Sequence, residues 1–354
     1  MNVKSTIVAV TLCSPALTAP GETPLAFGPE QGSSLAKSID MSLDFALEDF
    51  SLVVDGEDIG AIMGGFDFSM LIDSSFEVTD EYAEMGDGVP RKLVRTFDRL
   101  ASDVSVSVIS EFGGEDQDIA SESDLEGRTV VFTWDDDAQA YTTAFASGEG
   151  ETDLLEDLTE DMDFRALLPD KDVSVGESWE VPLEELECIA APGGNVKLLP
   201  DTGEEVEDFS EMQEMFEDKF SDLGELFEGQ WTCTYLGQSE DDAKLALIGI
   251  ETTVEASIDL TETLLELVDM VAAEVEEELP DIQVDTADLT FEFEGAGTLA
   301  WDQSEGHFAS FDLAGDLIFS ADLAVSVDVE GESHSAELYL EMSGTLEESA
   351  AATE

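Results

Sequence analysis

The fold is decided by the stretch FDLAGDLIFSADLAVSV, which spans residues 311–327. Apolar and polar side chains alternate along most of it, which is typical of a β-strand with one apolar face and one wet face. The apolar positions are Phe311, Leu313, Leu317, Phe319, Leu323, Val325 and Val327. Because an ordinary strand has about 5 to 6 residues, a run of this length predicts a wide, curved antiparallel sheet.

Further strands of the same kind are expected on both sides of this stretch. Residues 39–47 and 66–78 show the same alternation near the N-terminus. Short apolar runs separated by turn residues predict two more hairpins. These join Val130–Trp134 to Tyr141–Phe145 and Trp231–Tyr235 to Ala246–Ile250.

Counting outward from an expected turn predicts which residues lie opposite one another. From the turn at residues 86–88, Arg95 is predicted opposite Glu77. The same count places Arg99 opposite Asp73. Opposite charges on facing strands stabilise a sheet. We therefore interpret the basic cluster Arg91, Lys92, Arg95 and Arg99 as structural rather than as a site for an anionic ligand.

Aromatic rings are expected to lie over glycines of the neighbouring strand near the C-terminus. The predicted register sets Phe293 across from Gly315 and Phe319 across from Gly344. A glycine beneath an aromatic ring lets a sheet bend sharply. The pattern therefore predicts curvature.

Two long segments carry apolar residues at helical spacing. They are Glu204–Glu228 and Thr261–Leu279, the second ending before Pro280. An amphipathic helix buries its apolar stripe against another element. The predicted fold is therefore mainly β with α: a large curved antiparallel sheet, or half-barrel, covered on its apolar face by these helices.

The N-terminal residues are typical of an export signal. Lys4 precedes the apolar run Ile7–Leu12, and small residues follow it. The expected organisation is a signal peptide at 1–19, a Pro/Gly/Ser-rich spacer at 20–35, one domain at 36–348 and a flexible tail at 349–354. We expect the protein to be exported, to the periplasm or the exterior.

Two cysteines remain once the signal segment is set aside. Cys188 and Cys233 form an even pair, which in an oxidising compartment predicts a disulfide. The alternative is two buried thiols in a cytoplasmic protein.

The charge is extremely acidic. The 354 residues include 86 Asp and Glu but 12 Lys and Arg, for a net charge of −74. Such a surface repels polyanions, which argues against nucleic acid as a partner. Non-specific cations are more compatible, although solubility in concentrated salt explains the same composition. No apolar run of 18 residues or more occurs, so no transmembrane segment is expected.

No catalytic or metal-binding motif stands out. The two histidines, His307 and His334, fall at predicted hairpin ends without a partner for a triad or a zinc site. The two later cysteines lack the CxxC spacing of a zinc site. We therefore expect a protein that is not an enzyme, with no cofactor and no metal.

Three parts of the chain resemble a group of uncharacterised exported bacterial proteins. They are DEY at 80–82 with DGVPRKLVRTFD at 87–98, the LP at 168–169 with VSVGESW at 173–179, and the hairpin from Gly297 to Leu313. That group is similar in fold to periplasmic lipoprotein carriers of the LolA, LolB and LppX kind. The resemblance implies a half-barrel around an apolar cavity, and it implies lipid carriage by fold analogy alone.

The functional hypothesis is an exported, acidic, non-enzymatic protein that binds a hydrophobic small molecule or lipid in an apolar cavity. The alternative is a structural or interaction protein of the envelope or exterior, with a solid core and an acidic surface that keeps it soluble or contacts cations. The candidate cavity lining is Phe216, Phe220, Val268 and Val271 on the helices, with Phe291, Phe293, Phe311, Leu313 and Phe319 on the sheet.

Overall fold

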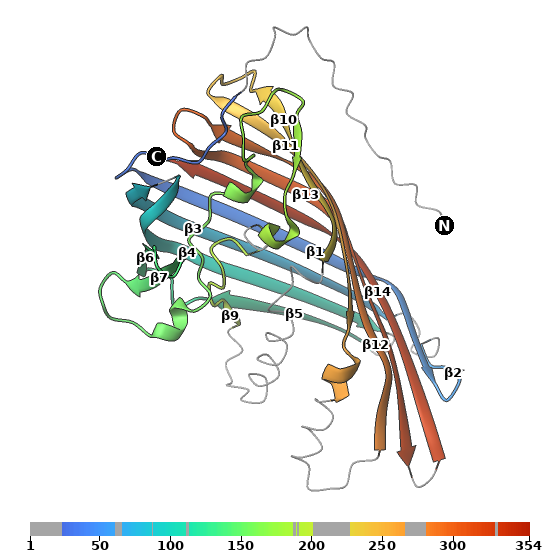
Figure 1. Ribbon diagram of the computed structural model, residues 1–354. Coiled ribbons are helices and arrows are strands. Elements are labelled where there is room, and N and C mark those ends of the chain that lie inside the picture. The colour runs from blue at the N-terminus through green and yellow to red at the C-terminus, as the bar shows by residue number, and fades with distance from the viewer. Residues whose placement is uncertain are drawn as a thin grey trace.

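A computed structural model of the chain contains one large antiparallel sheet of 14 strands (Figure 1). The structure describes residues 23–60, 66–86, 88–110, 113–186, 189, 191–200, 227–265, 281–329 and 332–354. The strands are β1 (Ser34–Val54), β2 (Glu57–Asp58), β3 (Asp67–Gly86), β4 (Val89–Ser110), β5 (Gly113–Glu122), β6 (Thr129–Asp135), β7 (Ala140–Phe145), β8 (Ser178–Glu180), β9 (Leu199–Pro200), β10 (Phe227–Gln238), β11 (Leu245–Asp259), β12 (Asp281–Asp302), β13 (His307–Val329) and β14 (Glu332–Thr353).

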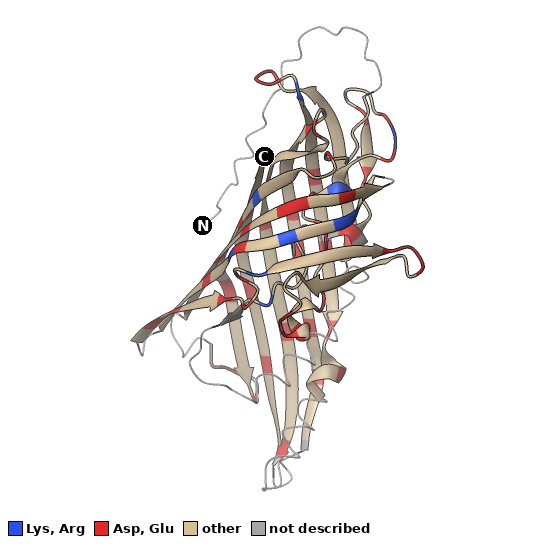
Figure 2. Ribbon diagram, turned by 90° about the vertical axis from the view of Figure 1, so that its left-hand side faces the viewer, with Lys and Arg blue, Asp and Glu red and all other residues tan. Residues whose placement is uncertain are grey.

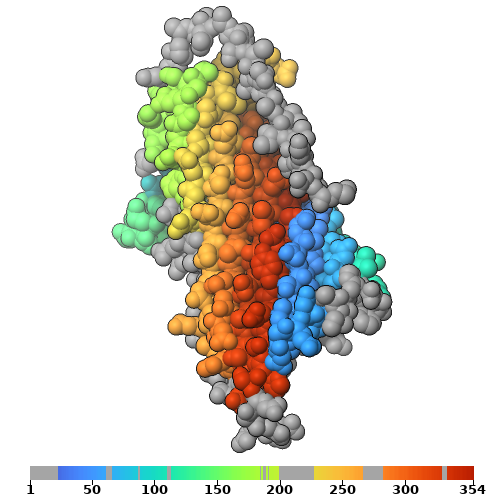
Figure 3. All heavy atoms as spheres, turned by 90° about the vertical axis from the view of Figure 1, so that its right-hand side faces the viewer, coloured from blue at the N-terminus to red at the C-terminus, as the bar shows by residue number. Residues whose placement is uncertain are grey.

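Six of these strands are unusually long and form the middle of the sheet. Along the main path the order is β7-β6-β4-β3-β1-β14-β13-β12-β11-β10-β8. The prediction from residues 311–327 is confirmed, because β13 spans 23 residues and contains the whole stretch. The first and last strands of the chain, β1 and β14, pair side by side at the centre of the sheet, as Figure 3 shows for β12, β13, β14 and β1 together.

Alternation gives the sheet two chemically different faces. We call the side that carries Ile39 and Phe311 the apolar face. The opposite side carries Asp40 and Asp312 and is the acidic face. Residues directly opposite in register share a face, so the assignment extends from strand to strand across the ladder.

The predicted hairpins form, although several registers are shifted. The β6–β7 and β10–β11 hairpins are present. In the β3–β4 hairpin, however, Arg95 lies opposite Asp80, and Arg99 lies opposite Glu77. Bulges near Glu77 and Glu81 shift the count by adding unpaired residues to one strand. The basic residues still face acids, which was the functional point of the prediction.

Aromatic rings do lie over glycines, although the register of the strands differs from the predicted one. Phe293 lies opposite Leu317 rather than Gly315. Its ring nevertheless covers Gly315, where an added Cβ would come within 2.3 Å of a ring carbon. Phe45 lies opposite Gly344 and covers it in the same way. These are positions where no larger residue fits beneath the ring.

Among the described residues, the apolar face is covered at one end by an irregular segment. This covering segment, residues 146–198, includes the short 3-10 turns η1 (Thr152–Leu155), η2 (Arg165–Leu167) and η3 (Leu183–Leu186). Figure 1 shows it crossing in front of the sheet. Phe164 stacks on Phe311 with ring centroids 4.3 Å apart, and Leu167 is fully buried.

The expected helical cover is therefore corrected for the described residues. Glu228 lies in β10, and of the second helix the described part is the single turn 261–265. The remainder of both predicted helices, residues 204–226 and 266–279, lies outside the described residues. No helix in the described ranges is long and apolar enough to cross a membrane.

Both predicted flexible ends are partly wrong as well. Leu25 and Phe27, from the expected spacer, are buried in the core. Residues 349–353, from the expected tail, continue β14, with Ala352 opposite Lys37. The predicted signal peptide at 1–19 lies outside the described residues.

A charge-balanced network is buried where the covering segment meets the sheet. Lys37 Nζ lies 2.7 Å from Asp80 Oδ2 and 2.8 Å from Asp163 Oδ1. Arg95 donates from Nε to Asp80 Oδ1 at 2.7 Å and from Nη2 to Asp80 Oδ2 at 2.8 Å. Tyr82 donates its hydroxyl to Asp163 at 2.8 Å. Two cations and two anions are thus paired directly with one another, as a buried ion cluster requires.

This network fastens the covering segment to β1, β3 and β4. Arg95 also donates to the backbone carbonyls of Thr159 at 3.0 Å and Glu160 at 2.8 Å. Burial alone would raise the pKa of Asp80, but the neighbouring Arg95 and Lys37 outweigh it and hold the pKa at about 2. The carboxylate stays ionised at neutral pH.

Replacing Asp80 with Asn should destabilise the fold strongly. The change leaves Lys37 and Arg95 buried and removes one of the two carboxylates that neutralise them. Breaking a buried ion pair in this way typically costs roughly 3–5 kcal/mol. Urea unfolding followed by circular dichroism measures this change in the free energy of unfolding.

Glu77→Gln is the matched control for Asp80→Asn. Glu77 lies on the same strand and also faces an arginine of β4, but its pair with Arg99 is exposed and 3.9 Å long. Its loss should cost less than about 1 kcal/mol. Equal effects of the two variants would contradict a structural role for the buried network.

Candidate functional site

The five predicted lining residues of the sheet lie on one face of it. Phe291 and Phe293 come from β12, and Phe311, Leu313 and Phe319 come from β13. The register places all five on the apolar face. The four helical candidates, Phe216, Phe220, Val268 and Val271, lie outside the described residues.

These five residues fall into two environments. Phe293, Phe311 and Leu313 are buried, and Phe164 of the covering segment stacks directly on Phe311. Phe291 and Phe319, opposite one another farther along the same strands, are half-buried. The core is therefore filled at the covered end, and the apolar face continues beyond it.

That continuation is a broad surface which we call the apolar wall. Its members are half-buried apolar side chains on the apolar face of four adjacent strands. They are Phe45, Phe50, Phe291, Phe319, Leu323, Leu338, Leu340 and Met342. Large apolar side chains gathered in this way usually meet another apolar surface or a ligand.

One acidic side chain, Glu348, lies among apolar side chains of the apolar face. Glu348 lies opposite Met41 on one side and Leu313 on the other, and it is 3% exposed. Its Oε1 atom is buried without a hydrogen-bond partner. Burial raises the pKa of Glu348 to about 8, so at neutral pH its carboxyl is mostly protonated.

Sequence reasoning missed Glu348, although a signal existed. Glu347 and Glu348 are consecutive, and strand neighbours point to opposite faces. One of the two must therefore lie on the apolar face, since Leu346 and Ala350 follow the apolar period. Among 86 acids, this one was not singled out.

A cavity of about 420 Å³ lies on the apolar face, between the sheet and the covering segment. Its floor includes Met41, the cross-strand neighbour of Glu348, and Ser74 from β3. Ser74 donates a hydrogen bond to Ser102 at 2.9 Å. The loop from Pro192 to Leu198 forms the opposite wall. The floor of the cavity is thus mixed, with the Ser74 hydroxyl between the apolar side chains of Met41 and Phe76.

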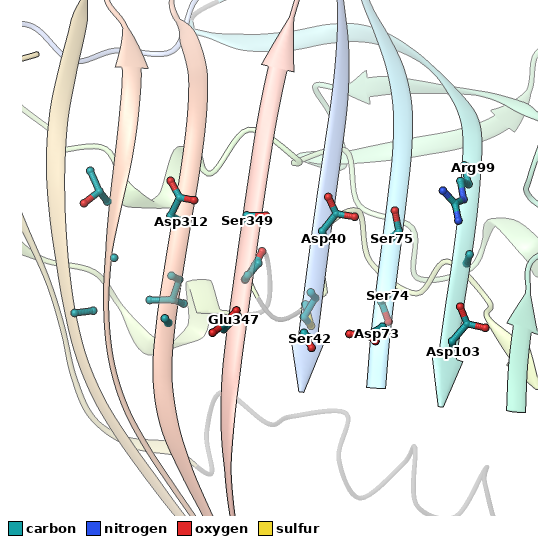
Figure 4. A pocket seen from close by; sticks show the side chains of 18 residues that line it. Asp40, Ser42, Asp73, Ser74, Ser75, Arg99, Asp103, Asp312, Glu347 and Ser349 are labelled. Atoms are coloured by element: carbon teal, nitrogen blue, oxygen red, sulfur yellow. The ribbon is translucent and has the colours of Figure 1, made fainter. Parts of the chain in front are cut away.

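The acidic face is hollowed by a groove of about 780 Å³, shown in Figure 4. Two rows of side chains cross adjacent strands there. The first row is Asp312, Ser349, Asp40 and Ser75, and the second is Glu347, Ser42, Asp73 and Asp103. Arg99 is the basic residue of this lining. A second groove of about 890 Å³ adjoins it, lined by Glu251, Glu294 and Asp316 among others.

These carboxylates are spread out rather than gathered into a metal site. Within the described ranges, no group of three or more His, Cys, Asp or Glu residues could hold a metal ion. Figure 2 shows acidic positions distributed over strands and loops, with few basic ones between them. The acidic face is suited to solvation and to diffuse contact with cations.

The remaining sequence candidates are placed as follows. Cys233 is buried, and burial raises the pKa of its thiol to about 12. Its predicted partner Cys188 lies outside the described residues, so the disulfide stays a prediction. His307 is buried next to the Phe308 carbonyl, and His334 pairs with Asp55 at 2.8 Å.

Comparisons with known proteins add little. No protein-family model matches the chain, and no curated protein matches it. Among solved structures, it aligns with the translocator domain of the autotransporter NalP from Neisseria meningitidis at 8% identity, covering 91% of this chain and 89% of that one. The TM-score is 0.14, so this alignment carries no argument. The resemblance to lipoprotein carriers stays a prediction.

Glu348→Gln should remove a pH-dependent penalty on stability. The folded pKa is about 8 and the unfolded value 4.5, so between these values the folded state holds a proton that the unfolded state has lost. The contribution of the Glu348 carboxyl to the free energy of unfolding is complete below pH 4.5. Above that pH it falls by about 1.4 kcal/mol per pH unit until about pH 8. Urea unfolding at several pH values between 5 and 9 measures this effect. The free energy of unfolding of the variant should increase relative to that of the wild type as pH rises.

Glu347→Gln serves as the control for that measurement. It removes a carboxylate from the adjacent position, which is exposed on the acidic face. Its stability difference from the wild type should not grow in the same way with pH. A constant difference for Glu348→Gln would show that its carboxyl is not held neutral by burial.

Asp103→Asn should stabilise the protein at low salt. Asp103 lies directly opposite Asp73 on the acidic face, and like charges in facing positions destabilise a sheet by about 0.2–1 kcal/mol. The gain should shrink in 1 M salt because the repulsion is screened. Thermal unfolding at two salt concentrations measures both effects.

Asp44→Asn is the matched control for Asp103→Asn. Asp44 lies on the same face, but its cross-strand neighbours are Leu71 and Thr345. Its gain should be clearly smaller. Equal gains would mean that overall charge, and not the facing pair, sets the repulsion.

Proposed function

We propose that this protein is a non-enzymatic binding protein that holds an elongated apolar molecule, such as an acyl chain, on its apolar wall. The observation that carries the proposal is the continuation of the apolar face past the covering segment. There, Phe291, Phe319 and their neighbours remain half-buried. A solid scaffold has no need for such a surface.

The dimensions and energetics of the wall suit an acyl chain. From Leu317 to Val327, β13 extends over roughly 33 Å at 3.3 Å per residue. Each CH₂ group that leaves water contributes about 0.8 kcal/mol. Contact along part of this length therefore offsets the cost of ordering a flexible chain.

The charge distribution supports an aqueous setting for such a binder. The acidic face keeps the molecule hydrated and repels like-charged surfaces. Export to the periplasm or exterior remains part of the proposal, on the N-terminal pattern at 1–19 and the resemblance to lipoprotein carriers.

A scaffold or interaction protein is the second candidate. The stacking of Phe164 on Phe311 favours it, because the core is solid at the covered end. In that case the acidic grooves would serve solubility or cation contact, and the apolar wall would bind no small molecule.

A pair of neighbouring substitutions separates the two candidates. Phe319→Asp places a charge on the apolar wall, and Ile318→Asp places the same charge on the acidic face, where Ile318 is 42% exposed. We expect Phe319→Asp to weaken binding of a fluorescent acyl probe by about tenfold or more, since a buried charge is costly. Ile318→Asp should bind as the wild type does.

Circular dichroism and thermal unfolding of both variants show whether they are folded before binding is compared. Saturable probe binding by the wild type that only Phe319→Asp weakens supports the ligand-binding proposal. Absence of saturable binding to folded wild-type protein favours the scaffold.

A further inference from the structure

We propose that a cavity at the covered end of the sheet binds a quaternary ammonium group, such as that of choline, between aromatic rings. The cavity measures about 560 Å³ and shares no lining residue with the apolar wall. The inference therefore goes beyond the proposed function and describes a second, separate site.

The cavity lies where strands from both ends of the sheet meet the covering segment. Trp134 of β6 and Tyr141 of β7 come from one end of the strand order, and Trp179 of β8 comes from the other. Residues between 160 and 170 of the covering segment and the N-terminal residues 25–27 contribute further to the lining. Small-molecule sites typically enclose about 300–1,000 Å³, so this cavity is large enough for a ligand.

The three aromatic side chains of the strands are half-buried, so each retains some surface for a ligand. Trp134 and Tyr141 lie directly opposite one another in the β6–β7 hairpin. Their ring centroids are 5.0 Å apart and their planes are inclined at 70°. The two rings thus form a corner, in which a cation lies close to both and is attracted by the quadrupole of each.

Hydrogen bonds hold two of the rings in place before a ligand arrives. The Tyr141 hydroxyl donates to the Pro90 carbonyl at 2.7 Å. Trp179 donates from Nε1 to the Leu167 carbonyl at 3.2 Å. Rings that are already oriented lose little conformational entropy on binding.

Carboxylates dominate the charged part of the lining. Within the described ranges, its charged residues are Glu160, Asp161, Asp170, Glu180 and Glu185 with Arg165. Arg165 forms ion pairs with Glu160 and Asp161, so its positive charge is neutralised inside the cavity. The excess of carboxylates favours a cation and opposes an anion.

Aromatic rings of this site already contact cations of the protein itself. The Arg165 guanidinium lies 5.2 Å from the centroid of the Phe27 ring, which also lines the cavity. The Arg91 guanidinium lies 5.9 Å from the centroid of the Trp134 ring. Both distances are within the range of about 6 Å over which such attraction operates.

The chemistry of the lining suits an organic cation better than a metal ion. Across the described part of the chain, no group of three or more His, Cys, Asp or Glu residues could hold a metal. A quaternary ammonium group has no N–H to satisfy, so it leaves water readily for contact with ring faces. Recognition of such groups by aromatic cages is an established use of this interaction.

Titration calorimetry with a pair of isosteric ligands tests the inference. Choline is compared at pH 7 with 3,3-dimethylbutan-1-ol, which has the same shape but carbon in place of the charged nitrogen. Choline chloride replaces sodium chloride at constant ionic strength, so diffuse attraction to the acidic surface cancels. We expect choline to bind about tenfold or more tightly than the alcohol.

Substitutions of tyrosine then locate the binding. Tyr141→Leu should weaken choline binding by about fivefold or more, because one wall of the corner is lost. Tyr141→Phe keeps the ring and should bind much as the wild type does. Tyr339→Leu is the matched control, since Tyr339 is also half-buried and donates to a carboxylate, that of Glu341 at 2.7 Å, but lies outside the cavity.

The outcomes are distinct from those of the proposed function. Equal binding of choline and the alcohol, no choline binding, or equal losses in Tyr141→Leu and Tyr339→Leu would each overturn the inference. Circular dichroism shows whether the variants fold, and Trp179→Leu replaces Tyr141→Leu if that variant does not. Binding of a fluorescent acyl probe should be the same with and without choline, so failure here leaves the apolar wall as proposed.

Discussion

The alternation of apolar and polar residues along strands of 20 residues or more is the constraint on which the structure depends. Because neighbouring side chains point to opposite faces, every long strand contributes to one apolar face and one acidic face. The acidic face needs only water. The apolar face must be covered, and the covering segment, residues 146–198, does so over one end. The buried pairing of Lys37 and Arg95 with Asp80 and Asp163 fixes that segment in place.

Much of the sheet was predictable because its signal is local. Period-two alternation predicted β13, and turn residues predicted the β6–β7 and β10–β11 hairpins. Register was less predictable. A bulge such as that beside Ala300 adds one residue without any change in composition, so counting from a turn goes wrong beyond it. The residue pairs changed, but most shifts left the apolar residues on the same face.

The covering segment and the candidate site were predicted less well, for different reasons. Residues 146–198 pack through scattered anchors such as Phe164 and Leu167, which follow no helical or strand period. The lining on the sheet was found because alternation fixes a face. Glu348 was missed because it is one of 86 acidic residues. Two consecutive glutamates within a strand nevertheless require one of them to lie on the apolar face.

The central claim is that the apolar wall exists to hold a hydrophobic molecule and is not simply an incompletely filled core. Native mass spectrometry of freshly purified, folded protein tests this claim most directly. The account predicts discrete added masses that correspond to an acyl or alkyl molecule and disappear after lipid extraction. Bare protein alone, with no mass regained when such molecules are added back to the extracted protein, would contradict it.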